Sequence, residues 1–440
     1  MTFPETAQAA LRHIQRWPSG GTVRIVAHQD GDGVAGAAVA VRLMQSLGRL
    51  FHVTFSWRRD EQFWTGLERD TQDPMLVLDM GADQLPMLAT IAPRGLVVDH
   101  HPPGKEPNPR GWGQLNPWLA DLDGGRDASG ATTMLQLALA ADPERLDLAP
   151  AALAGAVADK QHMGGFQGPN KTMADAAVAA GTLRRVRHPR LDDLPMADQA
   201  RWPDATLRRA FGGGGAWLDE LSLPRNASPY ELGASERQRL ASALTLGLLR
   251  SGADASDAQD VLEDGYESPA HGDRSLVRLA SLADAACRMG DPGLGLALLL
   301  GNADASSEVD ALESKFLEVV RSQLAAVESN ATRLRGIRTA RVDDASWLAP
   351  VSNRILGRVV EDELPVVVTV MSSGRLVASA RATAAHERSG VDLGKLLAVV
   401  AAEYGGSGGG HARAAGASVP GDRADGFLAA LDSAVAKVIS

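Results

Sequence analysis

Residues 95–101 read GLVVDHH, a short apolar run that leads directly into one aspartate and two histidines. A continuous apolar run of this length is typical of a strand buried on both faces of a parallel sheet. Ligands of open α/β sheets bind outside the carboxyl ends of the strands, so polar residues at that position predict a site. Asp99, His100 and His101 are therefore the first candidate functional residues.

Two earlier segments have the same layout. Residues 22–27 (TVRIVA) run into the segment HQDGDG at 28–33, and residues 75–78 (MLVL) run into Asp79. The carboxyl ends of parallel strands meet at one edge of a sheet, so we expect the histidines and acids of these segments to lie close together.

Two further candidates stand at helix ends. Residues 151–158 predict an alanine-rich helix, and Asp159 follows it, where the helix dipole disfavours negative charge. We expect a nearby cation to compensate. Ser129 precedes a helix predicted over 131–140 and has the chemistry of an N-cap. Capping alone and an additional role in the site both stay open for Ser129.

Strand and helix patterns alternate over the first part of the chain. This alternation predicts an α/β fold with a doubly wound, mostly parallel sheet. The strands are expected at 22–27, 51–57, 75–79 and 96–98, with helices at 5–17, 34–43 and 85–91.

The remainder of the chain has a different pattern. Residues 182–330 predict helices without intervening strands, the last of them over 308–329. Strand signals resume at 337–342, and a hairpin is expected around the turn at 372–374, followed by a helix over 393–403. We therefore predict three domains: 1–181 with the parallel sheet, a helical insertion and linker at 182–334, and a smaller α/β domain at 335–440.

Composition narrows the chemistry. The single cysteine, Cys287, excludes an internal disulfide framework and a thiolate metal cage, which leaves oxygen and nitrogen ligands. The formal net charge of −10 disfavours a broad basic surface for long duplexes but not a local basic groove. No apolar run reaches the roughly 18 to 20 residues of a membrane span, and the N-terminus lacks a signal-peptide pattern. We expect a soluble, cytoplasmic protein that does not enter membranes.

Four carboxylates and two imidazoles make up the predicted cluster. Such a set suits Mn²⁺ or Mg²⁺ better than a structural zinc site. Two cations about 3.5 to 4 Å apart, sharing Asp79, could activate a water and stabilise the leaving oxygen of a phosphate ester. The sequence therefore predicts phosphodiester hydrolysis. The six candidate ligands are His28, Asp30, Asp32, Asp79, His100 and Asp159.

These motifs resemble those of the DHH phosphoesterases, a family named for the Asp-His-His triplet present here at 99–101. The His-x-Asp-x-Asp-Gly form of residues 28–33 is similar to that of the RecJ-like branch. Asp79 and Asp159 match the aspartates of the second and fourth motifs. Residues 408–416 (GGGHARAAG) resemble the signature of the DHH-associated domain. The resemblance covers roughly 20–180 and 335–440.

The resemblance implies a role for each motif residue. His28, Asp30 and Asp79 are expected to hold one Mn²⁺, and Asp32, Asp79, His100 and Asp159 a second, with Mg²⁺ as an alternative ion. His101 is expected to face the scissile phosphate, with Asp99 as its support. In the C-terminal domain, Arg381 and His411 are expected to bind substrate phosphates, and Gly408, Gly409 and Gly410 to let the backbone approach them.

The long insert separates the functional alternatives. Residues 285–298 resemble a segment of archaeal RecJ-like nucleases, which also carry an insert between two lobes, whereas nanoRNA and dinucleotide phosphodiesterases of the family lack one. The leading expectation is a Mn²⁺-dependent exonuclease that digests single-stranded DNA or RNA from an end, working with replication or repair proteins. The alternative is a phosphodiesterase for short oligonucleotides or a linear dinucleotide, which the acidic net charge favours.

An alternative outside the enzymes is a non-catalytic replication scaffold. The complete set of six candidate ligands argues against it, because four acids held together repel one another without a compensating role.

Overall fold

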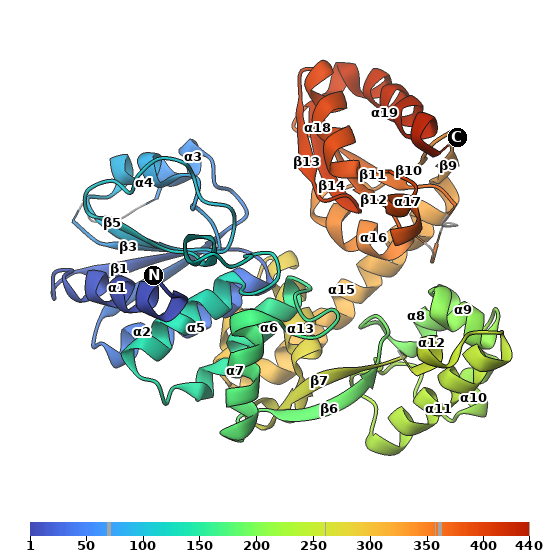
Figure 1. The fold of residues 1–440 in the computed structure, drawn as a ribbon, viewed down its shortest axis with the longest axis horizontal. Coiled ribbons are helices and arrows are strands. Elements are labelled where there is room, and N and C mark those ends of the chain that lie inside the picture. Colours follow the sequence, from blue (N-terminus) through green and yellow to red (C-terminus); the bar gives the residue numbers. More distant parts are fainter. Residues whose placement is uncertain (68–71, 260, 357, 360–362, 440) are drawn as a thin grey trace. The chain divides into compact units, whose positions relative to one another are not determined.

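The computed structural model describes residues 1–67, 72–259, 261–356, 358–359 and 363–439 (Figure 1). The chain divides into two compact units. The first comprises residues 1–195, 226–242 and 254–313, and the second comprises 196–225, 243–253 and 314–440. The three domains predicted from the sequence, with boundaries at 181 and 334, stay a prediction.

A five-stranded parallel sheet, sheet A, organises the first unit. Its strand order is β2-β1-β3-β4-β5, so the order reverses between β1 and β3, which is where ligands bind in such sheets. The doubly wound parallel sheet predicted from the sequence is confirmed. The strands are β1 (Thr22–His28), β2 (Leu50–Ser56), β3 (Met75–Leu78), β4 (Gly95–Val98) and β5 (Trp112–Leu115).

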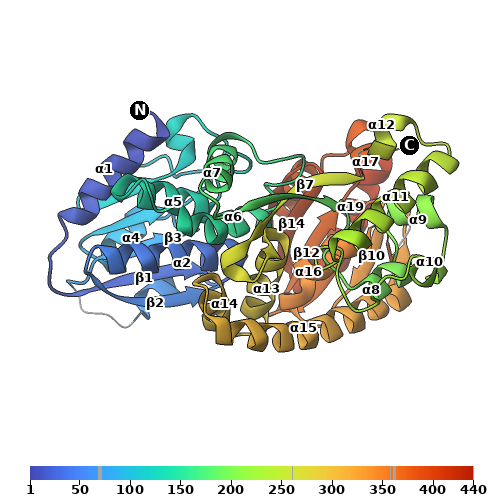
Figure 2. The same cartoon turned by 90° about the horizontal axis from the view of Figure 1, so that it is seen from below.

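Helices cover both faces of sheet A, which explains why its strands are apolar without alternation. Leu76 and Leu78 pack with α1 (Phe3–Gln15), α2 (Gly31–Ser46), α5 (Gly130–Ala141) and α6 (Ala149–Ala158). Met75 and Val77 point to the opposite face, where α3 (Glu61–Thr65) and α4 (Leu85–Ile91) lie (Figure 1). Figure 2 shows α2 lying along β1 and β2.

The first unit also contains an antiparallel sheet, sheet B, of β6 (Arg184–Pro189), β7 (Leu262–Ser268) and β8 (Arg274–Ser275). The expectation of helices without strands over 182–330 is therefore wrong. The strands of sheet B lack the apolar alternation that marks a strand, because ion pairs between neighbouring strands stabilise the sheet instead. The guanidinium of Arg184 lies 2.5 Å from the carboxylate of Glu267, its partner on the next strand. Strand β5 was also unexpected, since it lies at the end of a loop rich in proline and glycine.

The other α-helices that lie wholly in the first unit are α7 (Gly168–Ala179), α12 (Ala255–Gln259), α13 (Leu276–Arg288) and α14 (Pro292–Leu299). Two helices, α11 (Ala234–Arg250) and α15 (Ala303–Asn330), have residues in both units. Within the described ranges, no helix is both long enough and apolar enough to cross a bilayer.

The second unit contains a six-stranded sheet, sheet C, in the order β13-β14-β12-β11-β10-β9. The predicted hairpin is present: Ser372 pairs with Arg375, and Ser373 and Gly374 both have positive φ, 50° and 73°, as a two-residue hairpin turn requires. The strands are β9 (Thr332–Arg333), β10 (Arg338–Arg341), β11 (Val366–Ser372), β12 (Arg375–Arg381), β13 (Ser407–Gly410) and β14 (Ala414–Pro420).

Helices α18 (Leu393–Glu403) and α19 (Ala424–Ile439) pack on sheet C around Leu397, Phe427 and Leu431. The other helices of this unit are α8 (Met196–Arg201), α9 (Ala205–Phe211), α10 (Ala216–Glu220), α16 (Leu348–Ile355) and α17 (Ala384–Arg388). The bounds of α18 agree with the helix predicted over 393–403.

Asp432 on α19 anchors the start of β10. Its Oδ1 accepts hydrogen bonds from the backbone N–H groups of Gly336 (2.7 Å) and Ile337 (3.1 Å). Asp432→Ala leaves two buried N–H groups without an acceptor, so we expect a loss of about 1 to 3 kcal/mol of unfolding free energy in urea denaturation. The neighbouring exposed substitution Ser433→Ala serves as control and is expected to change it by less than ~0.5 kcal/mol. An unchanged midpoint for Asp432→Ala would contradict the anchoring role.

Candidate metal centre

The six residues expected to bind metal lie together at the carboxyl edge of sheet A. They stand at the ends of three neighbouring strands and of two helices: His28 ends β1, Asp79 follows β3, and His100 comes two residues after β4. Asp30 is the N-cap of α2, Asp32 lies in its first turn, and Asp159 is the C-cap of α6. Their roles as ligands stay a prediction.

Asp79 lies between the two imidazoles. Its Oδ2 is 3.6 Å from His28 Nδ1, and its Oδ1 is 3.2 Å from His100 Nε2. The backbone of Asp79 has a φ of 58°, a left-handed conformation that costs free energy for a residue with a side chain and clusters at functional sites. One carboxylate therefore contacts both halves of the cluster, as a bridging ligand does.

The other acids complete the two halves. Asp30 Oδ2 is 2.7 Å from His28 Nδ1. Asp159 Oδ2 is 3.1 Å and Asp32 Oδ2 is 3.9 Å from His100 Nε2. The structure thus groups His28, Asp30 and Asp79 on one side and Asp32, Asp79, His100 and Asp159 on the other.

Three glycines let the helices come this close to the ligands. A Cβ on Gly33 would lie 2.1 Å from the carbonyl oxygen of His28, where α2 folds back over β1. A Cβ on Gly130 would lie 2.8 Å from the Cβ of Asp79, and a Cβ on Gly155 would lie 2.4 Å from Asp32 Oδ1. Gly33 belongs to the quoted motif, whereas the sequence analysis did not identify Gly130 or Gly155, whose need arises only from helix packing.

Asp32 is fully buried against the N-terminus of α5. Its carboxylate accepts hydrogen bonds from the Ser129 hydroxyl (2.7 Å) and from the backbone N–H groups of Gly130 (2.7 Å) and Ala131 (3.1 Å). The positive end of a helix dipole stabilises such a carboxylate. Ser129 also caps α5 through the N–H of Thr132, so its hydroxyl serves both the helix and the cluster.

Asp99 orients the histidine pair. This buried carboxylate accepts hydrogen bonds from the N–H groups of Ala82, His100 and His101, and lies 2.8 Å from His101 Nδ1. The contact with Asp99 raises the pKa of His101, whose side chain is half-exposed. Asp99 thus contacts His101 directly, and its supporting role in catalysis stays a prediction.

The carbonyl of Gly124 turns His100 toward the cluster. His100 Nδ1 lies 2.6 Å from this oxygen, which leaves Nε2 to face Asp79 and Asp159. Gln161 Nε2 donates to the same carbonyl (2.9 Å), and Asn170 Nδ2 donates to Gln161 (2.6 Å). A backbone contact of this kind fixes the orientation of a ligating histidine. No local pattern in the sequence marks Gly124, Gln161 or Asn170, so these residues were not predicted.

The ionisation of the cluster reflects crowded carboxylates. Burial lowers the pKa of His28, but its contacts with Asp30 and Asp79 outweigh this and raise the pKa to about 11. Burial opposes the protonation of His100 as well, yet the charges of Asp159 and Asp79 hold its pKa well above the usual range. Burial raises the pKa of Asp159 to about 7, and the charges of Asp79 and Asp30 add to that rise while His100 opposes it. Protons bound to His28 and His100 therefore offset part of the negative charge of the carboxylates.

The donor set fits divalent cations. Oxygen and imidazole nitrogen are ligands for Mn²⁺ and Mg²⁺. Among the described residues, the buried atoms His28 Nδ1 and Asp79 Oδ1 lack a hydrogen-bond partner of acceptable direction, although acidic and basic groups surround them. Atoms in this state can accept a cation without giving up a hydrogen bond.

An exposed tryptophan stands beside the cluster. The ring of Trp57 meets that of His28 edge to face, with centroids 5.5 Å apart, and 44% of the residue is exposed. The guanidinium of Arg288 lies 5.4 Å from the centre of the Trp57 ring and is held by Asp284. The sequence analysis did not identify Trp57, because a lone aromatic residue at a strand end is not a distinctive signal.

Sheet C brings Arg381 and His411 to one of its ends within the second unit. Arg381 pairs with Ala414 at the end of β12, and His411 follows β13, whose last residue pairs with Ala415. Arg381 donates to Asn353 Oδ1 (2.9 Å) and Ser379 Oγ (3.1 Å), and His411 is exposed. Their binding of substrate phosphates stays a prediction.

The glycine run forms edge strand β13. A Cβ on Gly408 would lie 2.6 Å from the carbonyl oxygen of Leu397 in α18, and one on Gly410 would lie 2.6 Å from that of Ala414. Gly409 has open space at this position. Close packing on α18 and β14 thus accounts for Gly408 and Gly410, whereas the predicted approach of substrate phosphates has room at Gly409.

The sequence is similar to one protein family and to two further proteins. Residues 339–437 match the family described as the DHHA1 domain. The uncharacterized protein MJ0831 of Methanocaldococcus jannaschii is 22% identical over 439 residues, covering 94% of this chain and 93% of that protein. The single-stranded-DNA-specific exonuclease RecJ of Thermus thermophilus is 32% identical over 111 residues, covering 23% of this chain and 16% of that protein.

Solved structures share the fold along the whole chain. RecJ of Thermus thermophilus in complex with Mn²⁺ matches with a TM-score of 0.61 at 20% identity, over 99% of this chain and 55% of that one. An exonuclease RecJ bound to manganese matches with a TM-score of 0.57 at 19% identity, over 99% of this chain and 95% of that one. CDC45 of Entamoeba histolytica matches with a TM-score of 0.60 at 10% identity, over 98% of this chain and 99% of that one. The chain thus spans about half the length of the Thermus thermophilus protein.

We expect Mn²⁺ binding at pH 7.5 to release more than one proton, because His28 and His100 must lose theirs to become ligands. Since the bound state holds fewer protons, the affinity should rise as the pH rises from 6 to 8. Calorimetric titration in buffers of different ionisation enthalpy measures the number released. A pH-independent affinity without proton release would contradict the assignment.

Proposed function

We propose that this chain, a RecJ-like member of the DHH phosphoesterase superfamily, is a metal-dependent phosphodiesterase that hydrolyses nucleic acid. One observation carries the proposal. Asp79 lies between His28 and His100 at the strand-order reversal of sheet A, with Asp30, Asp32 and Asp159 around them. The donors lie at one edge of the sheet, where substrates bind in folds of this type.

The residues divide into two cation sites. His28, Asp30 and Asp79 hold one ion, and Asp32, Asp79, His100 and Asp159 hold the other. We take Mn²⁺ as the ion and Mg²⁺ as its substitute, since structures of the Thermus thermophilus RecJ contain one or the other. When bound, such a pair supplies an activated water and charge stabilisation for phosphodiester hydrolysis.

His101 faces the substrate in this proposal. Its side chain is 49% exposed, while its Nδ1 is held by the buried Asp99. The hydrogen bond with Asp99 raises the pKa of His101. In its protonated form the imidazole donates a hydrogen bond from Nε2 to a phosphate oxygen, and Asp99 keeps the ring in place for it.

Trp57 favours unpaired nucleic acid as the substrate. Exposed aromatic rings bind single strands by stacking on the bases, which a duplex does not offer. The ring of Trp57 lies against His28, so a base stacked on it brings its neighbouring phosphate to the cluster. We therefore propose a RecJ-like exonuclease that digests single-stranded DNA or RNA from an end. A role in replication or repair agrees with this activity.

The fold of CDC45 is the reason to keep a non-catalytic replication scaffold as the second candidate. Elemental analysis separates the two. A scaffold purifies without stoichiometric Mn²⁺ or Mg²⁺ and leaves oligonucleotides intact.

Asp79→Asn is expected to reduce hydrolysis of an end-labelled single-stranded 20-mer in Mn²⁺ by at least about 1000-fold, since it removes the carboxylate shared by both ions. Folding should persist, because the substitution relieves the crowding of carboxylates. Asp142→Asn, at an exposed acid in the same unit, serves as control and should keep full activity. Activity of Asp79→Asn would refute the bridging role. Faster hydrolysis of a dinucleotide than of the 20-mer by the unaltered protein would favour the short-oligonucleotide alternative.

Trp57→Ala is expected to raise KM for a single-stranded oligonucleotide by roughly 5- to 100-fold, since one base stack contributes about 1 to 3 kcal/mol. Trp57→Phe should recover part of the loss. Leu50→Ala, at an exposed residue on the opposite end of β2, is the control. If Trp57→Ala has the KM of the unaltered protein, bases do not stack there.

A further inference from the structure

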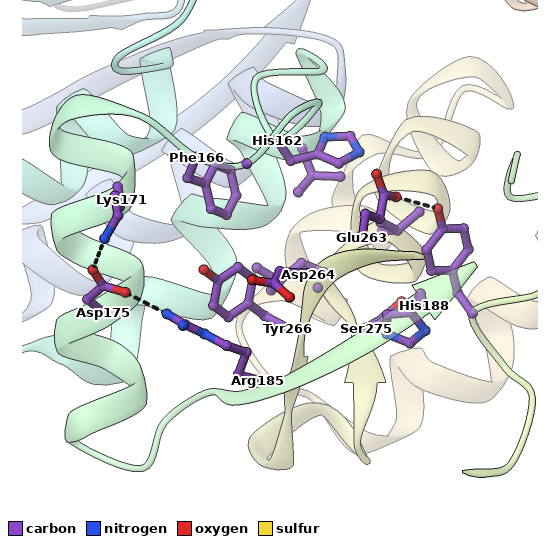
Figure 3. Close-up of a pocket in the computed structure, with 16 residues that line it drawn as sticks. His162, Phe166, Lys171, Asp175, Arg185, His188, Glu263, Asp264, Tyr266 and Ser275 are labelled. Atoms are coloured by element: carbon purple, nitrogen blue, oxygen red, sulfur yellow. Dashed lines mark hydrogen bonds and ion pairs between the residues drawn. The ribbon is translucent and has the colours of Figure 1, made fainter. Parts of the chain in front are cut away.

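The first unit has a cavity of about 140 Å³ outside the metal cluster (Figure 3). The turn after α6, helix α7, strands β6 and β7 and the start of α13 contribute its lining. The motifs described above do not include any of its residues, so the proposed hydrolysis does not explain it.

Apolar groups give the cavity its shape. The rings of Phe166 and Tyr266 lie stacked, with centroids 5.7 Å apart and an interplanar angle of 26°. Val157, Leu276 and Val277 supply aliphatic walls. A dry cavity of about 150 Å³ in another protein accommodates benzene, so this volume suits one six-membered ring.

The acidic groups of the lining already have positively charged partners. Figure 3 shows Asp175 between Lys171 and Arg185, and both contacts are drawn as dashed lines. A charged ligand would have to break such pairs, so the lining favours a neutral one. The pairs are Asp175 with Lys171 (2.5 Å) and Arg185 (2.7 Å), Glu263 with Arg190 (3.4 Å), and Asp264 with Arg187 (3.9 Å).

Two imidazoles in the lining have unmet hydrogen-bonding capacity. His188 is only 1% exposed, and neither of its ring nitrogens has a hydrogen-bond partner in the described part of the chain. His162 Nδ1 also has no hydrogen-bond partner among the described residues. Burial lowers the pKa of His188 to about 4 and that of His162 to about 3, so both rings are neutral at pH 7. A neutral imidazole offers one donor and one acceptor, and leaving them unpaired in the interior is costly.

The His188 ring is held in this position by the sheet. A Cβ on Gly265 of β7 would lie 2.6 Å from His188 Cδ2, so the glycine makes room for the ring. The ring of Tyr230 lies 5.1 Å from that of His188, and the Tyr230 hydroxyl contacts Glu263 (3.1 Å) and the carbonyl of Leu191 (2.9 Å). The unpaired nitrogens therefore belong to a packed side chain rather than to a loose one.

We propose that this cavity binds one pyrimidine base, a neutral planar ring whose edge carries both hydrogen-bond donors and acceptors. The choice of a nucleobase rests on the proposed function, which makes nucleic acid the substrate. The base comes either from a released nucleoside or nucleotide, or from the bound strand itself.

The cavity is connected to the metal cluster through one turn. His162 comes three residues after Asp159, and Gln161, between them, donates to the Gly124 carbonyl that orients His100. A base that pairs with His162 therefore contacts the turn that carries one candidate ligand and the support of another. We expect its binding to change the affinity for Mn²⁺.

Binding can be tested without turnover. The full chain in EDTA is titrated with uridine, cytidine and adenosine and followed by saturation-transfer NMR and calorimetry. We expect the pyrimidine nucleosides to bind with a Kd of about 1 mM or lower, and adenosine more weakly. Val277→Phe fills the cavity and should weaken binding at least tenfold. Met163→Ala, an exposed residue of the same turn that does not line the cavity, should leave it unchanged.

A second variant separates binding from folding. His188→Phe removes both unpaired nitrogens while keeping an aromatic ring. We expect it to weaken nucleoside binding at least tenfold and to leave the melting temperature equal or higher, because no protein hydrogen bond is lost. A melting temperature lowered by several degrees would show that His188 serves the fold and would overturn this assignment.

The source of the base follows from a third measurement. If free nucleosides do not bind, but a hydrolysis-resistant phosphorothioate oligonucleotide binds tenfold more weakly to Val277→Phe than to Met163→Ala, the base belongs to the bound strand and the proposal stands. If neither probe distinguishes the two variants, the proposal is overturned. If the unaltered protein hydrolyses oligonucleotides but the two variants bind both probes equally, only the base-binding proposal is overturned. If nucleosides bind in the cavity but no oligonucleotide is hydrolysed, only the proposed nuclease function is overturned.

Discussion

Repulsion among four carboxylates is the constraint on which the first unit depends. Asp30, Asp32, Asp79 and Asp159 cannot all stay ionised at one edge of a sheet unless positive charge lies among them. His28 and His100 supply it, since both imidazoles bind protons far more strongly than usual. Because ligation requires those protons to leave, the cluster is well suited to exchange them for divalent cations.

Backbone groups hold much of this cluster in place. The N-terminus of α5 binds Asp32, the carbonyl of Gly124 turns His100, and the N–H groups around Asp99 fix the histidine pair. Glycines at 33, 130 and 155 allow the helices to reach these positions. The backbone groups among these supports carry no net charge.

The cluster and the cavity address different parts of the same proposed substrate. The cluster suits the phosphodiester, the exposed ring of Trp57 offers a flat surface for one base, and the cavity offers a space of about 140 Å³ for another. His162 in the cavity and Asp159 in the cluster share one turn. The two proposals thus place base recognition and hydrolysis on the same short piece of backbone.

The parallel sheet and the grouping of the six candidate ligands could be predicted from the chain alone, because buried strands and the polar residues that follow them are local patterns. It could not reveal sheet B, whose strands are held by ion pairs such as Arg184 with Glu267 in place of apolar alternation. Nor could it reveal Gly130, Gly155, Gln161, Trp57 or the cavity. These features became visible in the folded chain, because each depends on contacts between segments far apart in the sequence. Contacts of that kind leave no periodic signal in either segment.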